Sequence, residues 1–86
     1  YFIQIGAFKK DINSFIRDVF EKLAGNKKLY QHNYNDLHIY RIGVFSKYNE
    51  AQTQLSIVKT GGIPDAFIIA YNNGKRIDLQ TARRLE

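Results

Sequence analysis

The stretch Ile3-Gln4-Ile5-Gly6-Ala7-Phe8 has a second copy further along the chain, Tyr40-Arg41-Ile42-Gly43-Val44-Phe45. Each copy runs apolar, polar, isoleucine, glycine, small apolar, phenylalanine. Successive side chains of a β-strand point to opposite faces. Each copy therefore has one apolar face and one face with a single polar group, Gln4 or Arg41. We expect the apolar faces to pack against helices and the polar faces to form a binding floor.

Length and composition favour one folded domain over residues 1–86. The chain is 44% hydrophobic and 14% aromatic, and it is too short for two separate cores. It contains no cysteine, which excludes disulfides and thiolate metal sites. No apolar run is long enough to span a bilayer. Because the first residue is not methionine, we expect a domain cut from a longer protein, with any signal peptide or anchor outside it.

The net charge of +5 favours an anionic partner such as nucleic acid, an acidic polymer or a lipid surface. The basic residues are scattered along the chain and never form more than a pair. The net positive charge can therefore also be explained without a partner, as a contribution to solubility.

Turn residues and apolar periodicity divide the chain into strands and helices. The predicted strands are 1–7, 28–32, 37–44, 66–71 and 75–77, with turns at 33–36 and 72–74. The candidate N-caps of three helices are Asp11, Ser46 and Asp78. The apolar stripe expected on the first helix contains Ile12, Phe15, Ile16, Val19 and Leu23, and that on the second contains Ala51, Leu55 and Val58.

This order of elements predicts an α+β fold of the split βαβ type, also called ferredoxin- or RNP-like. Residues 1–71 form its core, a four-stranded antiparallel sheet in spatial order 4-1-3-2 with two helices on one face. Residues 72–86 add a C-terminal hairpin and a short helix. The two motif strands then lie side by side, and Gln4 and Arg41 share the open face of the sheet.

Three stretches together resemble one known family. The stretch Tyr1-Phe2-Ile3-Gln4-Ile5-Gly6-Ala7-Phe8 resembles the opening of SPOR domains. The stretch Leu37-His38-Ile39-Tyr40-Arg41-Ile42-Gly43-Val44-Phe45 is similar to the third strand of that family. The stretch Gly61-Gly62-Ile63-Pro64-Asp65-Ala66-Phe67 is similar to its approach to the fourth strand. The tail 70–77 is similar to an extension found in members from Bacteroidota-like bacteria.

The resemblance implies a non-catalytic module of the bacterial cell envelope, located in the periplasm. Such a module binds peptidoglycan, prefers glycan strands that lack stem peptides, and brings its parent protein to the division septum. We expect a monomeric domain without cofactor or metal that does not bind nucleic acid. Contact with a membrane is expected only through a region outside this chain.

The predicted glycan-binding residues lie along the strands of the open face. They are Phe2, Gln4, Gly6, Ala7, Leu37, Ile39, Arg41 and Phe67. Gln4 matches the glutamine typical of the family. Three of these residues depart from the family pattern, which often has serine at Ala7, an aromatic residue at Leu37 and a basic residue at Ile39. Outside this set, Val44 replaces the usual proline. Each candidate also has a structural alternative, namely a solvated side chain, packing under the tail or, for Gly6, a β-bulge.

Two other functions share this topology. RNA-recognition modules stack bases on the aromatic residues of the central strands, and an open sheet can also pair with another protein. No catalytic constellation is present. His32 and His38 do not have metal-ligand spacing, and the serines lack the context of an activated nucleophile.

Overall fold

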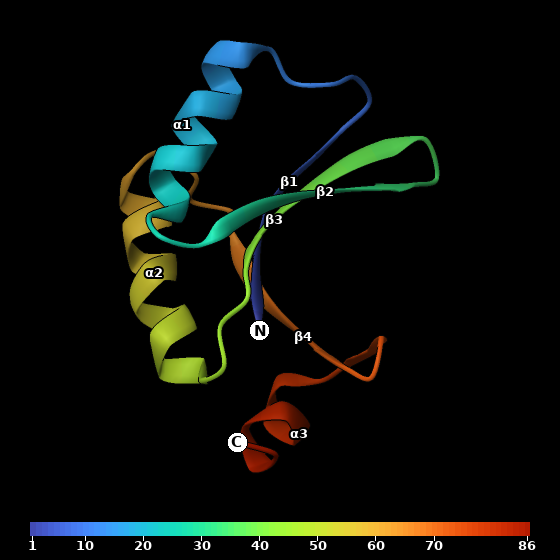
Figure 1. The fold of residues 1–86 in the computed structure, drawn as a ribbon, viewed down its shortest axis with the longest axis vertical. Coiled ribbons are helices and arrows are strands. Elements are labelled where there is room, and N and C mark those ends of the chain that lie inside the picture. Colours follow the sequence, from blue (N-terminus) through green and yellow to red (C-terminus); the bar gives the residue numbers. More distant parts are fainter.

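The computed structural model describes all residues from 1 to 86 (Figure 1). In chain order its elements are β1 (Phe2–Phe8), α1 (Ser14–Ala24), β2 (Lys28–Tyr34), β3 (Leu37–Gly43), α2 (Tyr48–Thr60), β4 (Phe67–Asn72), β5 (Lys75–Ile77) and α3 (Leu79–Arg84). The α+β class is therefore confirmed, and the predicted strand and helix positions are close to those observed.

One antiparallel sheet has the strand order β2-β3-β1-β4-β5. It contains five strands, whereas the predicted sheet had four and strand 75–77 was assigned to a separate C-terminal hairpin. The fifth is the return arm of the tail hairpin, which turns at Asn73 and Gly74 with φ of 52° and 80° and pairs with β4. Two consecutive residues with positive φ match the right-handed twist of neighbouring strands, so the tail extends the sheet at its edge.

The β2–β3 hairpin is longer than expected. The predicted strand 28–32 extends to Tyr34, because only Asn35 and Asp36 form the turn, with φ of 49° and 63°. These residue types tolerate the left-handed conformation that a two-residue turn requires.

The hydrophobic core lies on one face of the sheet, under α1 and α2, which cover the same side in Figure 1. Its strand residues alternate as predicted, with Ile3 and Ile42 fully buried. The buried cluster consists of Ile3, Ile5, Phe20, Ala24, Tyr40, Ile42, Phe45, Ala51, Leu55, Val58, Ala66 and Ile68. Both copies of the motif thus place their apolar face against the helices.

The start of α1 differs from the prediction. Its N-cap is Asn13, whose side chain accepts from the amide of Ile16 at 2.9 Å, and not Asp11. The Asp11 carboxylate instead accepts from the hydroxyl of Tyr40 at 3.2 Å and lies 3.2 Å from Nδ1 of His38. Asp11 therefore ties the connection between β1 and α1 to the sheet.

The apolar stripe of α1 is only partly buried. Phe15 is 75% exposed, and Ile16 and Val19 are also exposed, contrary to the prediction. The helix packs through its C-terminal half, where Phe20 and Ala24 are buried. Its first two turns therefore contribute less to the core than the periodicity predicts.

The start of α2 is capped from the far end of the chain. Its N-cap is Lys47 rather than the predicted Ser46, and Lys47 makes no side-chain capping bond. The amide of Tyr48 instead donates to the Glu86 carboxylate at 3.0 Å, and the Tyr1 hydroxyl donates to the same carboxylate. The cap predicted for α3 is confirmed, since Asp78 accepts from the amide of Thr81 at 2.8 Å.

The third helix therefore lies beside the start of α2, on the helix side of the sheet and below it in Figure 1. Its buried residue, Ala82, faces a small hollow lined also by Tyr1 and Ala70. The tail does not cover the opposite face of the sheet. None of the helices is both long and apolar enough to cross a membrane.

Candidate functional site

Gln4 and Arg41 lie directly opposite each other on the adjacent central strands β1 and β3. The Arg41 Nε donates to the Gln4 Oε1 at 3.4 Å. Both side chains are half-buried, and both point away from the buried Ile3 and Ile42 that flank them. The polar faces of the two motif copies thus meet on the sheet face opposite α1 and α2, which we call the open face.

Two aromatic side chains extend this pair into a row across four strands. Tyr30 of β2 lies opposite Arg41, and Phe67 of β4 lies opposite Gln4. Adjacent strands are ~4.8 Å apart, so three such spacings make the row roughly 14 Å long. Tyr30 and Phe67 are 40% and 44% exposed, so the pair is flanked on both sides by rings that a ligand can reach.

Phe2 and Tyr71 complete the floor next to this row. The Phe2 ring lies edge-on between Tyr30 and Tyr71, with centroid separations of 5.9 and 6.0 Å. The guanidinium carbon of Arg41 lies 5.3 Å from the centre of the Tyr71 ring. We call the six residues Phe2, Gln4, Tyr30, Arg41, Phe67 and Tyr71 the central patch.

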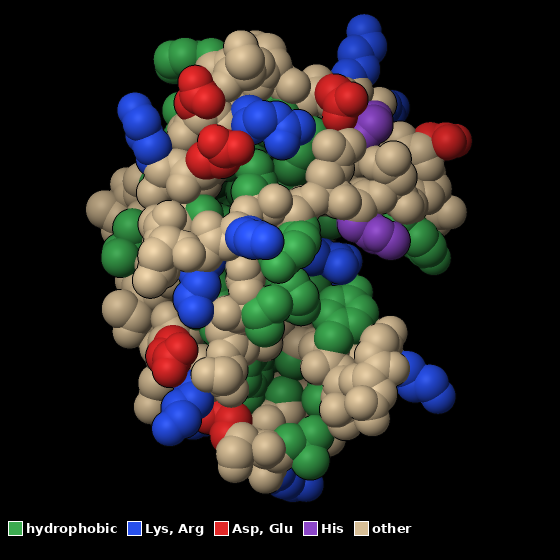
Figure 2. All heavy atoms as spheres, viewed as in Figure 1, with side chains coloured by type: hydrophobic (Ala, Val, Ile, Leu, Met, Phe, Trp, Pro, Cys, Tyr) green, Lys and Arg blue, Asp and Glu red, His purple; other side chains and the backbone are tan.

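The open face is hollowed. Figure 2 shows the molecule indented on the side away from α1 and α2, between the β2–β3 hairpin and the β4–β5 hairpin. Hydrophobic and basic side chains line the indentation. The central patch therefore lies between two projecting hairpins rather than on a flat surface.

The other predicted site residues lie towards the tip of the β2–β3 hairpin. Ala7 and His32 both pair with Ile39, and Tyr34 pairs with Leu37. Ala7 is exposed and Leu37 is half-buried, but Ile39 is only 8% exposed. Ile39 supports the floor from within and offers little surface to a ligand.

Gly6 does not belong to the open face. The register between β1 and β3 shifts between Gln4 and Gly6, so Gly6 pairs with Tyr40, which faces the core. A Cβ on Gly6 would lie 2.6 Å from the Phe8 ring. That ring packs against Phe20 of α1. The β-bulge considered as an alternative for Gly6 is thus present. Gly6 therefore does not contact a ligand on the open face, contrary to the prediction.

Tyr30 and Tyr71 were not among the predicted site residues. The signal for Tyr30 was its alternation with Leu29, which packs against the core and so directs Tyr30 to the other face. For Tyr71 the signal was its place two residues after Ile69, which lies opposite Phe2. Both tyrosines follow from strand alternation once the register of the neighbouring strands is known.

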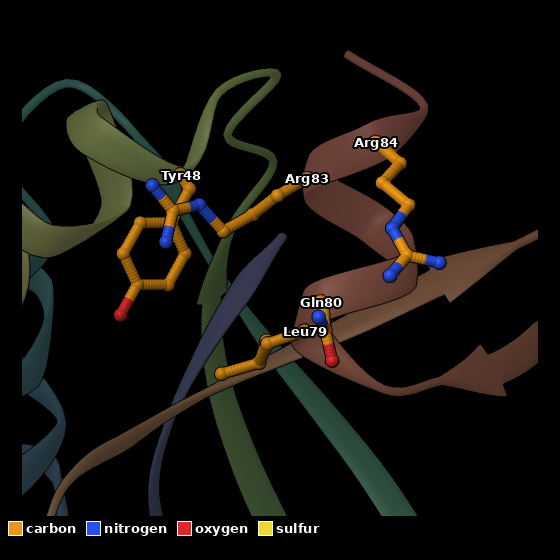
Figure 3. Close-up of a pocket in the computed structure, with 5 residues that line it drawn as sticks. All are labelled: Tyr48, Leu79, Gln80, Arg83 and Arg84. Carbon is orange, nitrogen blue, oxygen red and sulfur yellow. The ribbon is translucent and has the colours of Figure 1, made fainter.

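A separate hollow, of about 560 Å³, lies between α2 and α3 (Figure 3). It is lined by Tyr48, Leu79, Gln80, Arg83 and Arg84. The Arg83 guanidinium stacks on the Tyr48 ring, 4.6 Å from its centre.

The Glu86 clamp lies next to this hollow. Bonds from Tyr1 and from the amide of Tyr48 lower the pKa of the Glu86 carboxyl. Loss of hydration, and then the bond to Glu86, raise the pKa of Tyr1 to about 12. These contacts hold the tail in place away from the open face.

Chemically, the open face offers ring surfaces, amide donors and a cation. Nothing on it resembles a metal site, because no group of three or more histidine or acidic side chains is placed to hold an ion.

Comparisons of the chain with protein-family models, with curated proteins and with solved structures found no match.

Proposed function

We propose that the open face binds peptidoglycan glycan strands, with a preference for strands that lack stem peptides. The single observation that carries the proposal is the uncovered row Tyr30–Arg41–Gln4–Phe67 on a hollowed sheet face. Sugar rings have apolar faces that pack on aromatic side chains, and their hydroxyl and acetamide groups match an amide donor. The Gln4 oxygen is occupied by Arg41, so its amide nitrogen is available to a ligand.

The fold supports the same proposal. We infer a split βαβ sandwich to which β5 has been added at one edge, because the order of the other four strands is that of this topology. The motif strands β1 and β3 are then its central pair. The stretches that resemble SPOR domains include both of these strands.

We propose a binding module rather than an enzyme. None of the eight acidic residues of the chain lies in a strand. Glycoside hydrolysis typically uses two carboxylates that flank the scissile bond, so the open face does not have that arrangement. In this proposal the domain acts as a monomer in the periplasm and directs its parent protein to the division septum.

The test is co-sedimentation with purified sacculi, measured before and after an amidase has removed the stem peptides. We expect more protein in the pellet after treatment. Equal binding to both preparations would contradict the preference for stripped strands, and absence from both pellets would contradict glycan binding itself.

A matched pair of variants locates the binding face. Phe67→Ala removes an exposed ring from the central patch, and Phe15→Ala removes a more exposed ring from α1. We expect only Phe67→Ala to reduce sedimentation. Equal losses in both variants would indicate non-specific adsorption.

Single-stranded nucleic acid is a second candidate ligand, favoured by the exposed rings of Tyr30 and Phe67 on a basic sheet. Base stacking on such rings tolerates any sequence, and phosphate binding weakens steeply with salt. A titration with single-stranded RNA at two salt concentrations tests it. Salt-sensitive binding that is stronger than binding to glycan would favour this candidate.

A further inference from the structure

Charge is distributed unevenly between the strands and the rest of the molecule. The strands contain four Lys or Arg residues and no Asp or Glu. Three of the four, Lys28, Arg41 and Arg76, alternate onto the open face, since Lys28 pairs with Gly43 and Arg76 pairs with Tyr71. The fourth, Lys75, points to the other side. The open face is therefore positively charged and carries no acidic strand residue.

Arg41 is the cation at the centre of this face, and it has no acidic partner. The one ion pair within 4.0 Å in the structure joins His38 and Asp11. The Arg41 side chain makes a single hydrogen bond, from Nε to Gln4, and stacks on Tyr71. These two contacts fix the plane of the guanidinium while both terminal amino groups remain free.

A fixed guanidinium with two free amino groups is suited to a planar, two-oxygen anion. Arginine binds carboxylates through two parallel N–H···O bonds, which add direction as well as strength. Arg41 is half-buried on an aromatic floor, so such a bond is less weakened by water than one at a fully exposed site.

We propose that Arg41 binds a carboxylate of the ligand, so that the open face selects acidic sugar chains over neutral ones. This inference rests on the proposed function. In peptidoglycan the lactyl carboxyl of the acidic sugar forms an amide with the stem peptide, and removal of the peptide releases it as a free carboxylate. A single cation at Arg41 therefore accounts for a preference for stripped strands, because only they carry a free carboxylate on the sugar itself.

The experiment compares three ligands of equal length. These are stripped glycan, the same glycan with its lactyl carboxylates converted to primary amides, and a neutral oligomer of N-acetylglucosamine. Affinity is measured by calorimetry at one salt concentration. We expect the stripped glycan to bind ~10- to 100-fold more tightly than its amidated form, the range for a charge-assisted hydrogen bond.

Two variants of equal charge show whether Arg41 is the cause. Arg41→Gln removes the cation of the open face, and Lys75→Gln removes a cation that points to the other side. We expect Arg41→Gln to bind the stripped and amidated glycans equally, and Lys75→Gln to keep the full preference. Arg41→Lys should restore part of it, because lysine keeps the charge but loses the two-bond geometry.

The outcomes distinguish this inference from the function on which it rests. If the unmodified protein binds stripped and amidated glycan equally, the carboxylate contact is wrong although glycan binding stands. If Lys75→Gln loses the preference as fully as Arg41→Gln, overall charge and not Arg41 is responsible. Binding to none of the three ligands contradicts the proposed function. If Arg41→Gln fails to fold, Arg41→Lys takes its place, and a preference as large as that of the unmodified protein would contradict the two-bond contact at Arg41.

Discussion

The ring of Tyr71 supports the guanidinium of Arg41, whose central carbon lies 5.3 Å from the ring centre. Tyr71 is also in edge contact with Phe2, at a centroid separation of 6.0 Å. One residue near the end of β4 thus orients both the cation and the neighbouring ring of the central patch.

The first prediction concerns this support. Tyr71→Leu should weaken glycan binding about 2- to 5-fold, because a cation–π contact near the surface contributes ~0.5–1 kcal/mol. Tyr71→Phe should bind normally, since it keeps the ring. Phe15→Leu, on α1 and away from the open face, is the control. Calorimetric titration checks all three, and weak binding by Tyr71→Phe would assign the effect to the hydroxyl.

The second prediction separates the two faces of the motif strands. Gln4→Ala should change the free energy of unfolding by less than ~0.5 kcal/mol, because the side chain faces the open side. Ile42→Ala should cost about 2–5 kcal/mol, because Ile42 is fully buried. Urea denaturation measures both. A large loss of stability in Gln4→Ala would mean that the assignment of the two faces is reversed.

The third prediction concerns the pH dependence of the clamp between Tyr1 and Glu86. The pKa of Tyr1 is raised from 10.0 to about 12, so its stabilisation is complete below pH 10 and is lost as the pH approaches 12. The pKa of Glu86 is lowered from its usual 4.5, so its stabilisation is present above pH 4.5 and is lost at lower pH. The urea concentration at the midpoint of unfolding should therefore be constant at intermediate pH and should decrease at both acidic and alkaline pH.

Two variants assign the two slopes. Tyr1→Phe should remove the alkaline fall, and Glu86→Gln should reduce the acid fall. Part of the acid fall should remain in Glu86→Gln, because the bonds from Thr81 also lower the pKa of Asp78. An unchanged alkaline fall in Tyr1→Phe would show that another group is responsible.

The fourth prediction concerns the two phenylalanines of α1. Phe15→Ser should leave the stability nearly unchanged, because Phe15 is 75% exposed. Phe20→Ala should cost about 3–5 kcal/mol, because Phe20 is only 6% exposed. Thermal unfolding measures both effects. A strongly destabilised Phe15→Ser would mean that the first turns of α1 are packed.

The strands and turns were largely predictable from local chemistry. Alternation places Ile3 and Ile42 on one side and Gln4 and Arg41 on the other, and Asn73-Gly74 specifies its hairpin. The cap at Asp78 is likewise local, since its partner Thr81 lies within the same helical turn.

The features that were mispredicted depend on contacts between distant parts of the chain. Asp11 is drawn away from α1 by Tyr40, which is far away in sequence. Ser46 is not needed as a cap because Glu86 serves that role. Periodicity shows that α1 is amphipathic. Which part of its apolar face is buried depends on packing against distant segments, so the exposure of Phe15 could not be read from the pattern.

The side chains of Tyr1 and Glu86 are in contact, so the residues at the two ends of the sequence lie near each other. A short linker of glycine and serine from residue 86 to residue 1 would therefore span little distance and interrupt no strand or helix. New ends opened at the Asn35-Asp36 turn would lie at the tip of the β2–β3 hairpin, away from both the core and the central patch. Such a circular permutant should keep its melting temperature within a few degrees of the parent, and a much lower value would show that the hairpin must remain continuous for folding.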